Sequence, residues 1–329
     1  MSRIIAGDIG GTKVLLEERE ILNGHCEVLR QRRFESGAYA SFDLIIEEFV
    51  GRGSAVDAIC LAVAGPVSSG VASVTNLPWR IAEDELGALL GCERVKVVND
   101  FYSVAHAVPQ LSPHDLVQIN QGSAGPADPI AVIGAGTGLG EAFLIPEDDQ
   151  STGWRVIPSE GGHCDFAPAD EKQSGLLVRL RQIHGHVSYE RVVSGPGLES
   201  VYEFICEGAG QSPAVSRVGE SRAAMVSRLA AAGDPQATQA FALFVSVYGA
   251  EAGNLALKVL SRGGVFIAGG VAAKNVAQFT SGLFLEAFLN KGRFRGLLEQ
   301  YPLHIITNTD AGLMGAADLA HAMLSAHRI

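Results

Sequence analysis

The sequence is poor in cysteine and in long apolar runs. Its five cysteines are odd in number and widely spaced, which argues against a disulfide framework and against a zinc site. Residues 1–8 hold too short an apolar stretch for a signal peptide. No later run reaches the roughly 20 residues that a membrane span needs. We therefore expect a cytoplasmic protein with reduced thiols and no membrane partner.

Positive charge is also in short supply. The 25 lysines and arginines face 36 aspartates and glutamates, which gives a formal net charge of -11. A nucleic-acid partner is disfavoured, because nucleic-acid binding relies on a basic field that releases counterions. Any phosphate site must therefore be built locally, from backbone N–H groups and a few side chains.

Length and composition indicate a globular α/β protein of two domains. The 329 residues are 47% hydrophobic and 19% charged. Strand-like and helical segments alternate, and residues 112–129 are rich in Ser, Pro, Gly and Asp, which is typical of a domain junction. We expect a small α/β domain at residues 1–110, completed by residues 303–329, and a large α/β domain at residues 111–302.

Glycine-rich turns stand out among these segments. A strand, a glycine-rich turn and a second strand are predicted at residues 3–16 and again at 130–145, which suggests an internal duplication. A third glycine pair, Gly269–Gly270, follows a buried strand where an adenosine can rest. Hairpins without ligands also contain glycine pairs, but glycines leave N–H groups open to phosphate oxygens. In the first turn Thr12 adds a hydroxyl donor and Asp8 a carboxylate for hydrated Mg²⁺.

Neither common nucleotide motif explains these turns, since both the P-loop spacing and the strand–helix context of a dinucleotide site are missing.

Polar residues at two places in the sequence also indicate a ligand-binding site. Asn99 and Asp100 end an apolar strand, where open α/β sheets commonly bind ligands, although both residue types also cap helices. Glu160 and His163 flank two glycines, a composition that suits sugar hydroxyls but also occurs in surface turns.

Taken together, these segments carry a resemblance to a known family. The motifs run through nearly the whole chain in family order: residues 7–12 (GDIGGT), 61–67 (LAVAGPV), 75–79 (TNLPW), 98–101 (VNDF), 136–140 (GTGLG), 159–163 (SEGGH), 194–198 (SGPGL) and 264–270 (GVFIAGG). With them the chain resembles the bacterial glucokinase family, within the actin/hexokinase/Hsp70 ATPase superfamily. The resemblance implies an α/β, two-domain actin-like ATPase (ribonuclease H-like) fold with a central cleft.

The resemblance also implies an enzyme of glycolysis, an ATP-dependent glucokinase that transfers the γ-phosphate of ATP to the 6-hydroxyl of glucose. Asp100 resembles the family's catalytic base, which orients the hydroxyl and accepts its proton. The residues assigned to the sugar are Asn76, Asn99, Asp100, Glu160, His163 and Glu190. Those assigned to ATP are Gly7, Asp8, Ile9, Gly10, Gly11, Thr12, Gly136, Thr137, Gly138, Gly269 and Gly270, with Asp8 as the Mg²⁺ ligand.

Two departures keep alternatives open. Lys13 stands where these glucokinases often carry asparagine, and lysine is common there in the related repressor/ORF/kinase family. That relative's clustered Cys/His zinc motif is missing, because no Cys-x-Cys pair occurs. The alternatives are a kinase for another hexose or an N-acetylhexosamine, and a non-catalytic sugar sensor on the same fold. Sensors of this kind usually carry a DNA-binding segment ahead of the first strand. A homodimer is a further expectation.

Overall fold

The structure is a computed structural model that describes residues 1–22, 25–51, 55–125, 127–147 and 153–325. The chain forms two compact units. Unit 1 comprises Met1–Leu111 and Asp310–Ile329, and unit 2 comprises Ser112–Thr309. Residues 326–329, the end of the predicted small domain, lie outside the described residues. Each unit has its own sheet and its own hydrophobic core.

Unit 1 is built on a five-stranded sheet in the order β3-β2-β1-β4-β8. The first three strands are antiparallel, whereas β4 runs parallel to β1 and β8 parallel to β4. The strands are β1 (Ser2–Ile9), β2 (Lys13–Leu22), β3 (His25–Glu35), β4 (Ala58–Val63) and β8 (Val95–Asn99), and a small second sheet holds β5 (Val67–Ser68), β6 (Val71–Ser73) and β7 (Arg80–Ala82). The helices are α1 (Phe42–Val50), α2 (Glu83–Leu90), α3 (Asp100–Ala107), α12 (Ala311–Ser325) and the short η1 (Ser36–Ala38) and η2 (Val108–Gln110).

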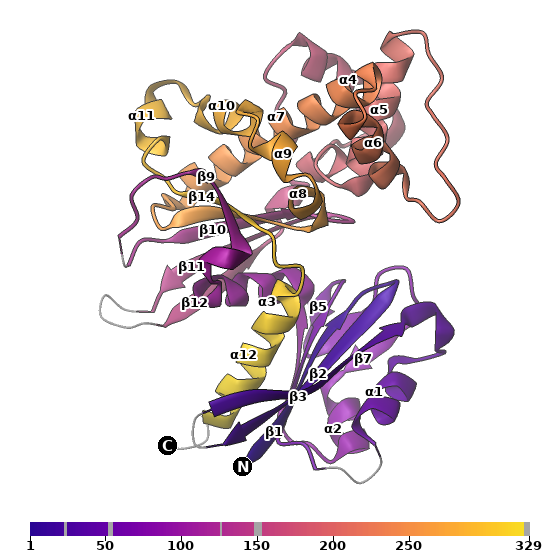
Figure 1. Cartoon of the computed structure of the whole chain (residues 1–329), viewed down its shortest axis with the longest axis vertical. Coiled ribbons are helices and arrows are strands. Elements are labelled where there is room, and N and C mark those ends of the chain that lie inside the picture. Colours follow the sequence, from indigo (N-terminus) through magenta and orange to yellow (C-terminus); the bar gives the residue numbers. More distant parts are fainter. Residues whose placement is uncertain (23–24, 52–54, 126, 148–152, 326–329) are drawn as a thin grey trace. The chain divides into compact units, whose positions relative to one another are not determined.

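The main sheet of unit 1 is covered on both faces, which explains the continuous apolar runs of β1 and β4. Successive side chains of a strand point to opposite faces of the sheet. Ile5 and Ile59 therefore pack with α1, whereas Ile4 and Cys60 pack with Leu313 of α12. Figure 1 shows α12, at the yellow end of the chain, against this sheet. The C-terminal helix thus completes a core that the first hundred residues leave open.

Unit 2 is built on a six-stranded sheet in the order β12-β11-β10-β13-β14-β9. Its strands are β9 (Leu116–Asn120), β10 (Ile130–Ala135), β11 (Leu139–Pro146), β12 (Trp154–Ser159), β13 (Gly264–Ala268) and β14 (Leu303–Ile306). Its α-helices are α4 (Glu171–His184), α5 (Gly195–Gly208), α6 (Arg222–Ala231), α7 (Pro235–Val259), α8 (Gly270–Lys274), α9 (Val276–Phe279), α10 (Leu283–Leu289) and α11 (Arg295–Leu298). Short 3-10 helices are η3 (Pro113–Asp115), η4 (Gly161–His163), η5 (Tyr189–Arg191) and η6 (Gly292–Phe294).

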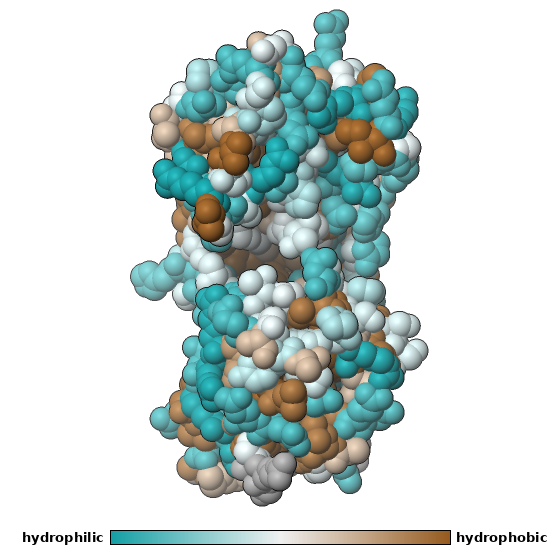
Figure 2. Space-filling view, turned by 90° about the vertical axis from the view of Figure 1, so that its right-hand side faces the viewer, coloured by the Kyte–Doolittle hydropathy of each residue, from teal (hydrophilic) through white to brown (hydrophobic). Residues whose placement is uncertain are grey.

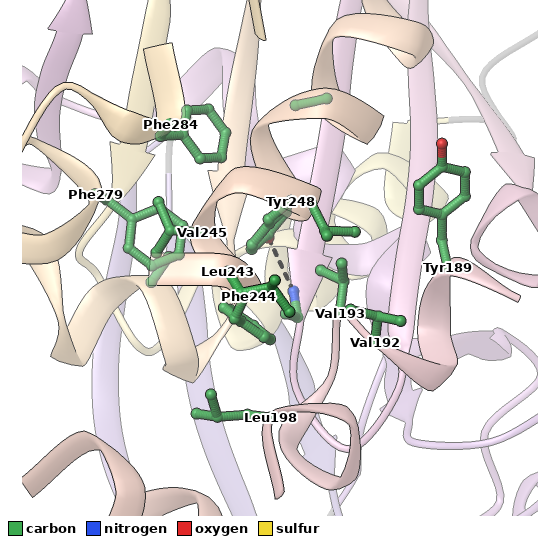
Figure 3. Packing of buried hydrophobic residues seen from close by; sticks show 14 of the residues in the cluster. Tyr189, Val192, Val193, Leu198, Leu243, Phe244, Val245, Tyr248, Phe279 and Phe284 are labelled. Atoms are coloured by element: carbon green, nitrogen blue, oxygen red, sulfur yellow. Dashed lines mark hydrogen bonds between the residues drawn. The ribbon is translucent and has the colours of Figure 1, made fainter. Parts of the chain in front are cut away.

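Helix α7 is the centre of the unit 2 core. Tyr248, from its middle, is fully buried and accepts a hydrogen bond from the backbone N of Ala135 at 3.0 Å (Figure 3). Its ring also meets Phe279 and Phe284 edge-on, at centroid distances of 5.5 and 5.7 Å. This contact set ties α7 to the end of β10, where a glycine-rich turn begins.

Within the described residues, α7 is the one helix long and apolar enough to cross a membrane. Of its most apolar window, 72% is buried inside the protein, as expected of a core helix. The face of the molecule in Figure 2 is mainly hydrophilic, and its hydrophobic residues form small, separate patches. The apolar character of α7 is therefore explained by packing.

The two sheets share one strand order. The order β12-β11-β10-β13-β14 repeats β3-β2-β1-β4-β8, with the same parallel and antiparallel pairs, and β9 is added beside β14. This repeat agrees with the duplication expected from the glycine-rich turns. Since Leu303–Ile306 pairs with β13, the chain passes into unit 1 at Asp310, seven residues after the boundary expected at residue 303.

Candidate active site

The first glycine-rich turn joins β1 to β2 in unit 1. The backbone N of Gly10 donates to the carbonyl oxygen of Lys13 at 2.9 Å and closes the turn. A Cβ atom at Gly11 would lie 2.7 Å from the carbonyl oxygen of Thr75, so a side chain there would displace the neighbouring loop. Thr12 is exposed at the tip. The turn thus presents main-chain atoms and a hydroxyl, as a phosphate site requires.

Gly7 and Ile9, two other residues assigned to ATP, are buried inside β1. A Cβ atom at Gly7 would lie 2.7 Å from Cδ2 of Leu61 on the neighbouring strand. Packing therefore accounts for the glycine at position 7 and for the apolar side chain at position 9. Both residues support the turn from within the sheet.

Asn76 lies beside this turn. Its Cβ atom is 3.8 Å from the Cβ position of Gly11, and its side chain is exposed. Its backbone is left-handed, with φ of +65°, a conformation that asparagine tolerates better than most non-glycine residues. The structure therefore brings Asn76 and the first turn together.

Asp8 is a half-buried carboxylate on β1, just before the turn. Burial raises the pKa of its carboxyl, Lys13 lowers that pKa, and Asp310 raises it. Asp310 comes directly before α12, and a Cβ atom at Gly312 would lie 3.8 Å from Cγ of Asp8. The start of α12 therefore approaches β1. Sequence reasoning missed Asp310, because no local pattern links the two ends of the chain.

Asn99 is the N-cap of α3. Its Oδ1 atom accepts hydrogen bonds from the backbone N of Phe101 at 2.9 Å and of Tyr102 at 3.2 Å. Its Nδ2 atom donates to the carbonyl oxygen of Gly65 at 3.2 Å. Asn99 therefore fills the capping role that the sequence alone left open between Asn99 and Asp100.

Asp100 is the first residue of α3 and is half-buried. Its Oδ1 atom accepts a hydrogen bond from the backbone N of Phe101 at 2.8 Å. Burial raises the pKa of the Asp100 carboxyl to about 6; hydrogen bonds oppose this rise, and the charge of Asp8 adds to it. A carboxylate with a raised pKa at the end of a strand suits proton transfer, and its second oxygen, Oδ2, takes no part in these hydrogen bonds at the start of α3.

The second glycine-rich turn joins β10 to β11 in unit 2. The backbone N of Gly136 donates to the carbonyl oxygen of Gly138 at 2.8 Å, and Thr137 is exposed at the tip. The backbone N of Gly195, the first residue of α5, donates to the carbonyl oxygen of Gly136 at 2.8 Å. The turn and the start of a 14-residue helix therefore lie together, and helix starts favour anions.

Gly269 connects β13 to α8 beside this turn. Its φ is +89°, and a Cβ atom there would overlap the carbonyl oxygen of Ala135 at the end of β10. Backbone conformation and close approach therefore both require glycine. Gly270 is exposed, with open space around its Cβ position. Because β10 and β13 are parallel neighbours, the two glycine segments meet at one edge of the sheet.

Glu160, His163 and Glu190 lie together in unit 2 and are called the sugar cluster below. Nε2 of His163 lies 3.9 Å from Oε2 of Glu160, and its Nδ1 lies 3.9 Å from Oε1 of Glu190. These distances are too long for direct hydrogen bonds, so the groups stay available to other partners. The Glu160 side chain is 92% exposed and that of Glu190 is 27% exposed. The three residues assigned to the sugar in unit 2 are thus brought together.

One contact joins this cluster to the second turn. Oε2 of Glu190 accepts a hydrogen bond from the backbone N of Leu139 at 2.9 Å, directly after Gly138. A Cβ atom at Gly138 would overlap the same carboxylate oxygen. Gly138 is therefore needed for the approach of Glu190. Sequence reasoning assigned both residues but did not find this contact, which depends on the tertiary fold.

Asp8 of unit 1 is the residue expected to bind a magnesium ion. Among the described residues, no group of three or more His, Cys, Asp or Glu side chains is arranged to hold a metal ion. In kinases Mg²⁺ usually keeps several waters and binds one or two carboxylates plus substrate phosphates. Asp8 matches this mode, because a half-buried carboxylate that is repelled by Asp310 is stabilised by a nearby cation.

Solved structures similar to this chain show which fold the two units form. The two units with one strand order form the two-domain actin-like ATPase fold. The crystal structure of a glucokinase from an Antarctic psychrotroph matches 98% of this chain and 99% of its own chain, with a TM-score of 0.83 and 30% identity. A glucokinase from Balamuthia mandrillaris in complex with glucose has a TM-score of 0.77 and covers 97% and 94% of the two chains, but at 23% identity it supports the fold alone.

The sequence comparisons give the family. A sequence model of the glucokinase family matches residues 5–323. The chain is 39% identical to the curated glucokinase of Nostoc sp., over 96% of this chain and 98% of the relative. It is 36% identical to the glucokinase of Yersinia enterocolitica, over 96% and 95%. The chain belongs to the glucokinase family.

Proposed function

We propose that the protein is an ATP-dependent glucokinase, which transfers the γ-phosphate of ATP to the 6-hydroxyl of glucose and yields glucose 6-phosphate and ADP. The observation that carries this proposal is the Asp100 carboxyl. It lies at the carboxyl end of β8, burial raises its pKa to about 6, and Asn99 takes over the capping of α3. Family membership supports the substrates.

Asp100 acts as the base. At neutral pH a carboxyl with a pKa of about 6 is mainly ionised, yet it holds a proton better than an ordinary aspartate. It accepts a hydrogen bond from the 6-hydroxyl, aims that oxygen at the γ-phosphorus and takes the proton late, because phosphoryl transfer has a loose transition state.

The glycine segments bind ATP in this proposal. Gly10, Gly11 and Thr12 of unit 1 and Gly136–Gly138 of unit 2 donate backbone N–H and hydroxyl groups to the phosphates. Gly269–Gly270 contacts the adenosine. The requirement for glycine at position 269, where the backbone lies close to the end of β10, supports this assignment. Asp8 would hold Mg²⁺ through its water shell, and the ion would neutralise charge on the β- and γ-phosphates.

Glu160, His163 and Glu190 bind the sugar in this proposal. Two carboxylates and an imidazole that make no hydrogen bonds to one another offer acceptors and a donor to several hydroxyls. Asn76 and Asn99 of unit 1 are assigned to the same sugar. Asn99 retains one N–H of its amide for this role, because the other is donated to Gly65.

Three further assignments belong to the proposal. The two units serve as the two functional domains, supported by their separate cores. The enzyme acts in the cytoplasm, and it forms a homodimer. Sedimentation tests the last point, because a single species near the monomer mass of 34.5 kDa at micromolar concentration would exclude the dimer.

A coupled ADP-release assay tests the function. Purified protein is supplied with Mg·ATP and, separately, glucose, mannose, fructose and N-acetylglucosamine. We expect the highest kcat/KM with glucose and loss of turnover when EDTA removes Mg²⁺. A higher kcat/KM with N-acetylglucosamine would overturn the choice of sugar. No turnover with any of the four sugars, together with unimpaired folding, would overturn the kinase assignment.

A further inference from the structure

A buried acid, Glu141, lies next to the turn that carries Glu160 and His163, two of the residues proposed to bind the sugar. It sits on β11 between Ile133 and Ser159 of the neighbouring strands and is 2% exposed. Neither of its carboxylate oxygens has a hydrogen-bond partner among the described residues. A Cβ atom at Gly161 would overlap its Oε2 atom. The carboxyl therefore touches the turn that carries Glu160 and His163.

The charges of Glu251 and Lys258, both on α7, act on this acid. Glu251 is fully buried and lies 3.3 Å from Nζ of Lys258 through Oε1. Its Oε2 atom accepts a hydrogen bond from Nδ2 of Asn254 at 2.8 Å. Nζ of Lys291 donates to Oδ1 of Asn254 at 2.6 Å. Glu251, Asn254, Lys258 and Lys291 thus form one polar network, and it acts on Glu141 through the charges of Glu251 and Lys258.

Tyr189 connects this network to Glu190, which follows it in the chain and is proposed to bind the sugar. Nδ2 of Asn254 donates to the hydroxyl oxygen of Tyr189 at 3.0 Å, and Figure 3 shows that hydroxyl pointing away from Val192. The backbone N of Tyr189 donates to the carbonyl oxygen of Cys164 at 3.0 Å. Tyr189 precedes Glu190, and Cys164 follows His163. The network therefore contacts both segments that carry sugar ligands.

The charge of Glu141 changes near neutral pH. Burial raises the pKa of its carboxyl to about 7, Glu251 adds to this rise, and Lys258 opposes it. In return, Glu251 and Glu141 raise the pKa of Lys258 against the effect of burial. Three titratable groups of α7 interact directly with Glu141: Glu251, Lys258 and Tyr248. Further out, Glu251 acts to raise the pKa values of Tyr189 and Lys291, and Cys164 acts to raise that of Lys258.

We propose that Glu141 is a positioning residue for the sugar: its neutral carboxyl packs against the Gly161 turn and so keeps Glu160 and His163 aligned with Glu190. The inference rests on the proposed function. When Glu141 loses its proton, an unpaired negative charge is buried against the turn, and this disfavours the packed arrangement, although Lys258 offsets part of the cost. Glucose affinity should therefore fall as the pH rises through about 7.

Glu141→Gln tests this inference, because it keeps the shape and removes the charge. At pH 8 we expect KM for glucose to fall about 5–10-fold, while kcat and KM for ATP change less than about twofold. In the wild-type protein KM for glucose should rise between pH 6 and pH 8. In the variant it should stay at the lower, acid-like value throughout. An unchanged KM with an unchanged pH profile would overturn the proposal.

Lys258→Gln provides a second variant, on a side chain that is 47% exposed and tolerates change. Since Lys258 lowers the pKa of Glu141, its loss should move the KM transition to higher pH. Glu18→Gln is the matched control, because Glu18 is equally buried at 2% but lies on β2 and is paired with Arg3 and Arg30. It should lower stability and leave KM for glucose unchanged. A transition that stays in place in Lys258→Gln would contradict the proposed anchor.

Hydrogen exchange separates this inference from the proposed function. The backbone amides of residues 160–164 should exchange more slowly in Glu141→Gln than in the wild-type protein at pH 8, with or without activity. If the wild-type protein phosphorylates no glucose, the proposed function fails, and the exchange rates still decide whether Glu141 anchors the turn. Equal exchange in the two proteins would overturn the anchor.

Discussion

The two units have the same strand order but carry different chemistry at their turns. Unit 1 gathers carboxylates, and burial raises the pKa values of both Asp8 and Asp100. Asp310 adds to the rise at Asp8, and Asp8 adds to the rise at Asp100. Unit 2 gathers backbone amides at Gly136–Gly138 and an open polar cluster that includes the 92% exposed Glu160. Under the proposed function, one topology thus supports a reactive site in one copy and a binding site in the other.

The difference arises from what fills equivalent places. In both sheets a glycine-rich turn follows the central strand, and parallel strands end at the same edge. In unit 1 β8 leads into Asp100, whereas its equivalent in unit 2, β14, leads into Thr307 and Asn308. In unit 2 β13 leads into Gly269 and Gly270, whereas its equivalent in unit 1, β4, leads into Ala64 and Gly65. A carboxylate accepts protons and attracts cations, while bare glycines admit a ligand to the main chain. The fold therefore fixes the position of the site, and the side chains decide its task.

The largest expected effect comes from Asp100→Asn, which removes the base and keeps the shape. We expect kcat to fall about 10²–10⁴-fold, the range usual for a lost general base. Glucose affinity, measured by titration calorimetry, should change far less. A variant with near-normal kcat would end the contrast between a reactive unit 1 and a binding unit 2.

The same variant has a stability signature. The folded-state pKa of Asp100 is raised to about 6 from 3.8, so the stability that it contributes below about pH 4 is lost as the pH rises through about 6. Asn carries no charge to lose. The melting temperature of Asp100→Asn should therefore equal or exceed that of the wild-type protein at pH 8, and the difference should vanish near pH 4.

The second effect is the pH dependence of kcat. Asp100 must be ionised to accept a proton, and burial places its pKa at about 6. We expect kcat to be flat above about pH 7 and to fall about tenfold per unit below pH 6. The residual activity of Asp100→Asn should lack this step. A wild-type step near pH 4 would mean that the carboxyl is solvated like an ordinary aspartate.

Much of this contrast could be predicted from the sequence. The strand, turn and strand at residues 3–16 and 130–145 correspond to β1 with β2 and β10 with β11, because aliphatic runs around glycines are a local signal. β3 was not predicted. Every residue of that edge strand except Phe34 is exposed, so it shows no alternation of apolar and polar residues.

The details of the site depend on tertiary structure. The pair Asn99–Asp100 was found from sequence, but which residue caps α3 was not, since Asn and Asp are equally good caps. The approach of Asp310 to Asp8 and the hydrogen bond from Leu139 to Glu190 join distant segments. No spacing rule encodes such contacts.

The third effect concerns ATP and the glycines of unit 2. Gly269→Ala adds a Cβ atom at a φ of +89°, against the carbonyl oxygen of Ala135. We expect KM for ATP to rise about tenfold, because the end of β13 must shift. Gly185→Ala is the control: its φ is +72° with open space around the Cβ position, at the end of α4. It should lower the melting temperature and leave KM for ATP unchanged, whereas equal KM values in both variants would contradict an ATP role for Gly269.

The smallest effect is expected from Glu160→Gln, at the exposed edge of the sugar cluster. A side chain that is 92% exposed gives up little hydration when it binds a hydroxyl, so KM for glucose should rise only about threefold. Gln keeps one acceptor and loses the charge that faces His163 across 3.9 Å. If unit 2 only binds the substrates, kcat of Glu160→Gln should stay within about twofold of the wild-type value, and the step in kcat near pH 6 should be preserved. A fall in kcat of about 10²-fold would place part of the proton transfer in unit 2, because only a group that acts on the transition state changes kcat and kcat/KM together.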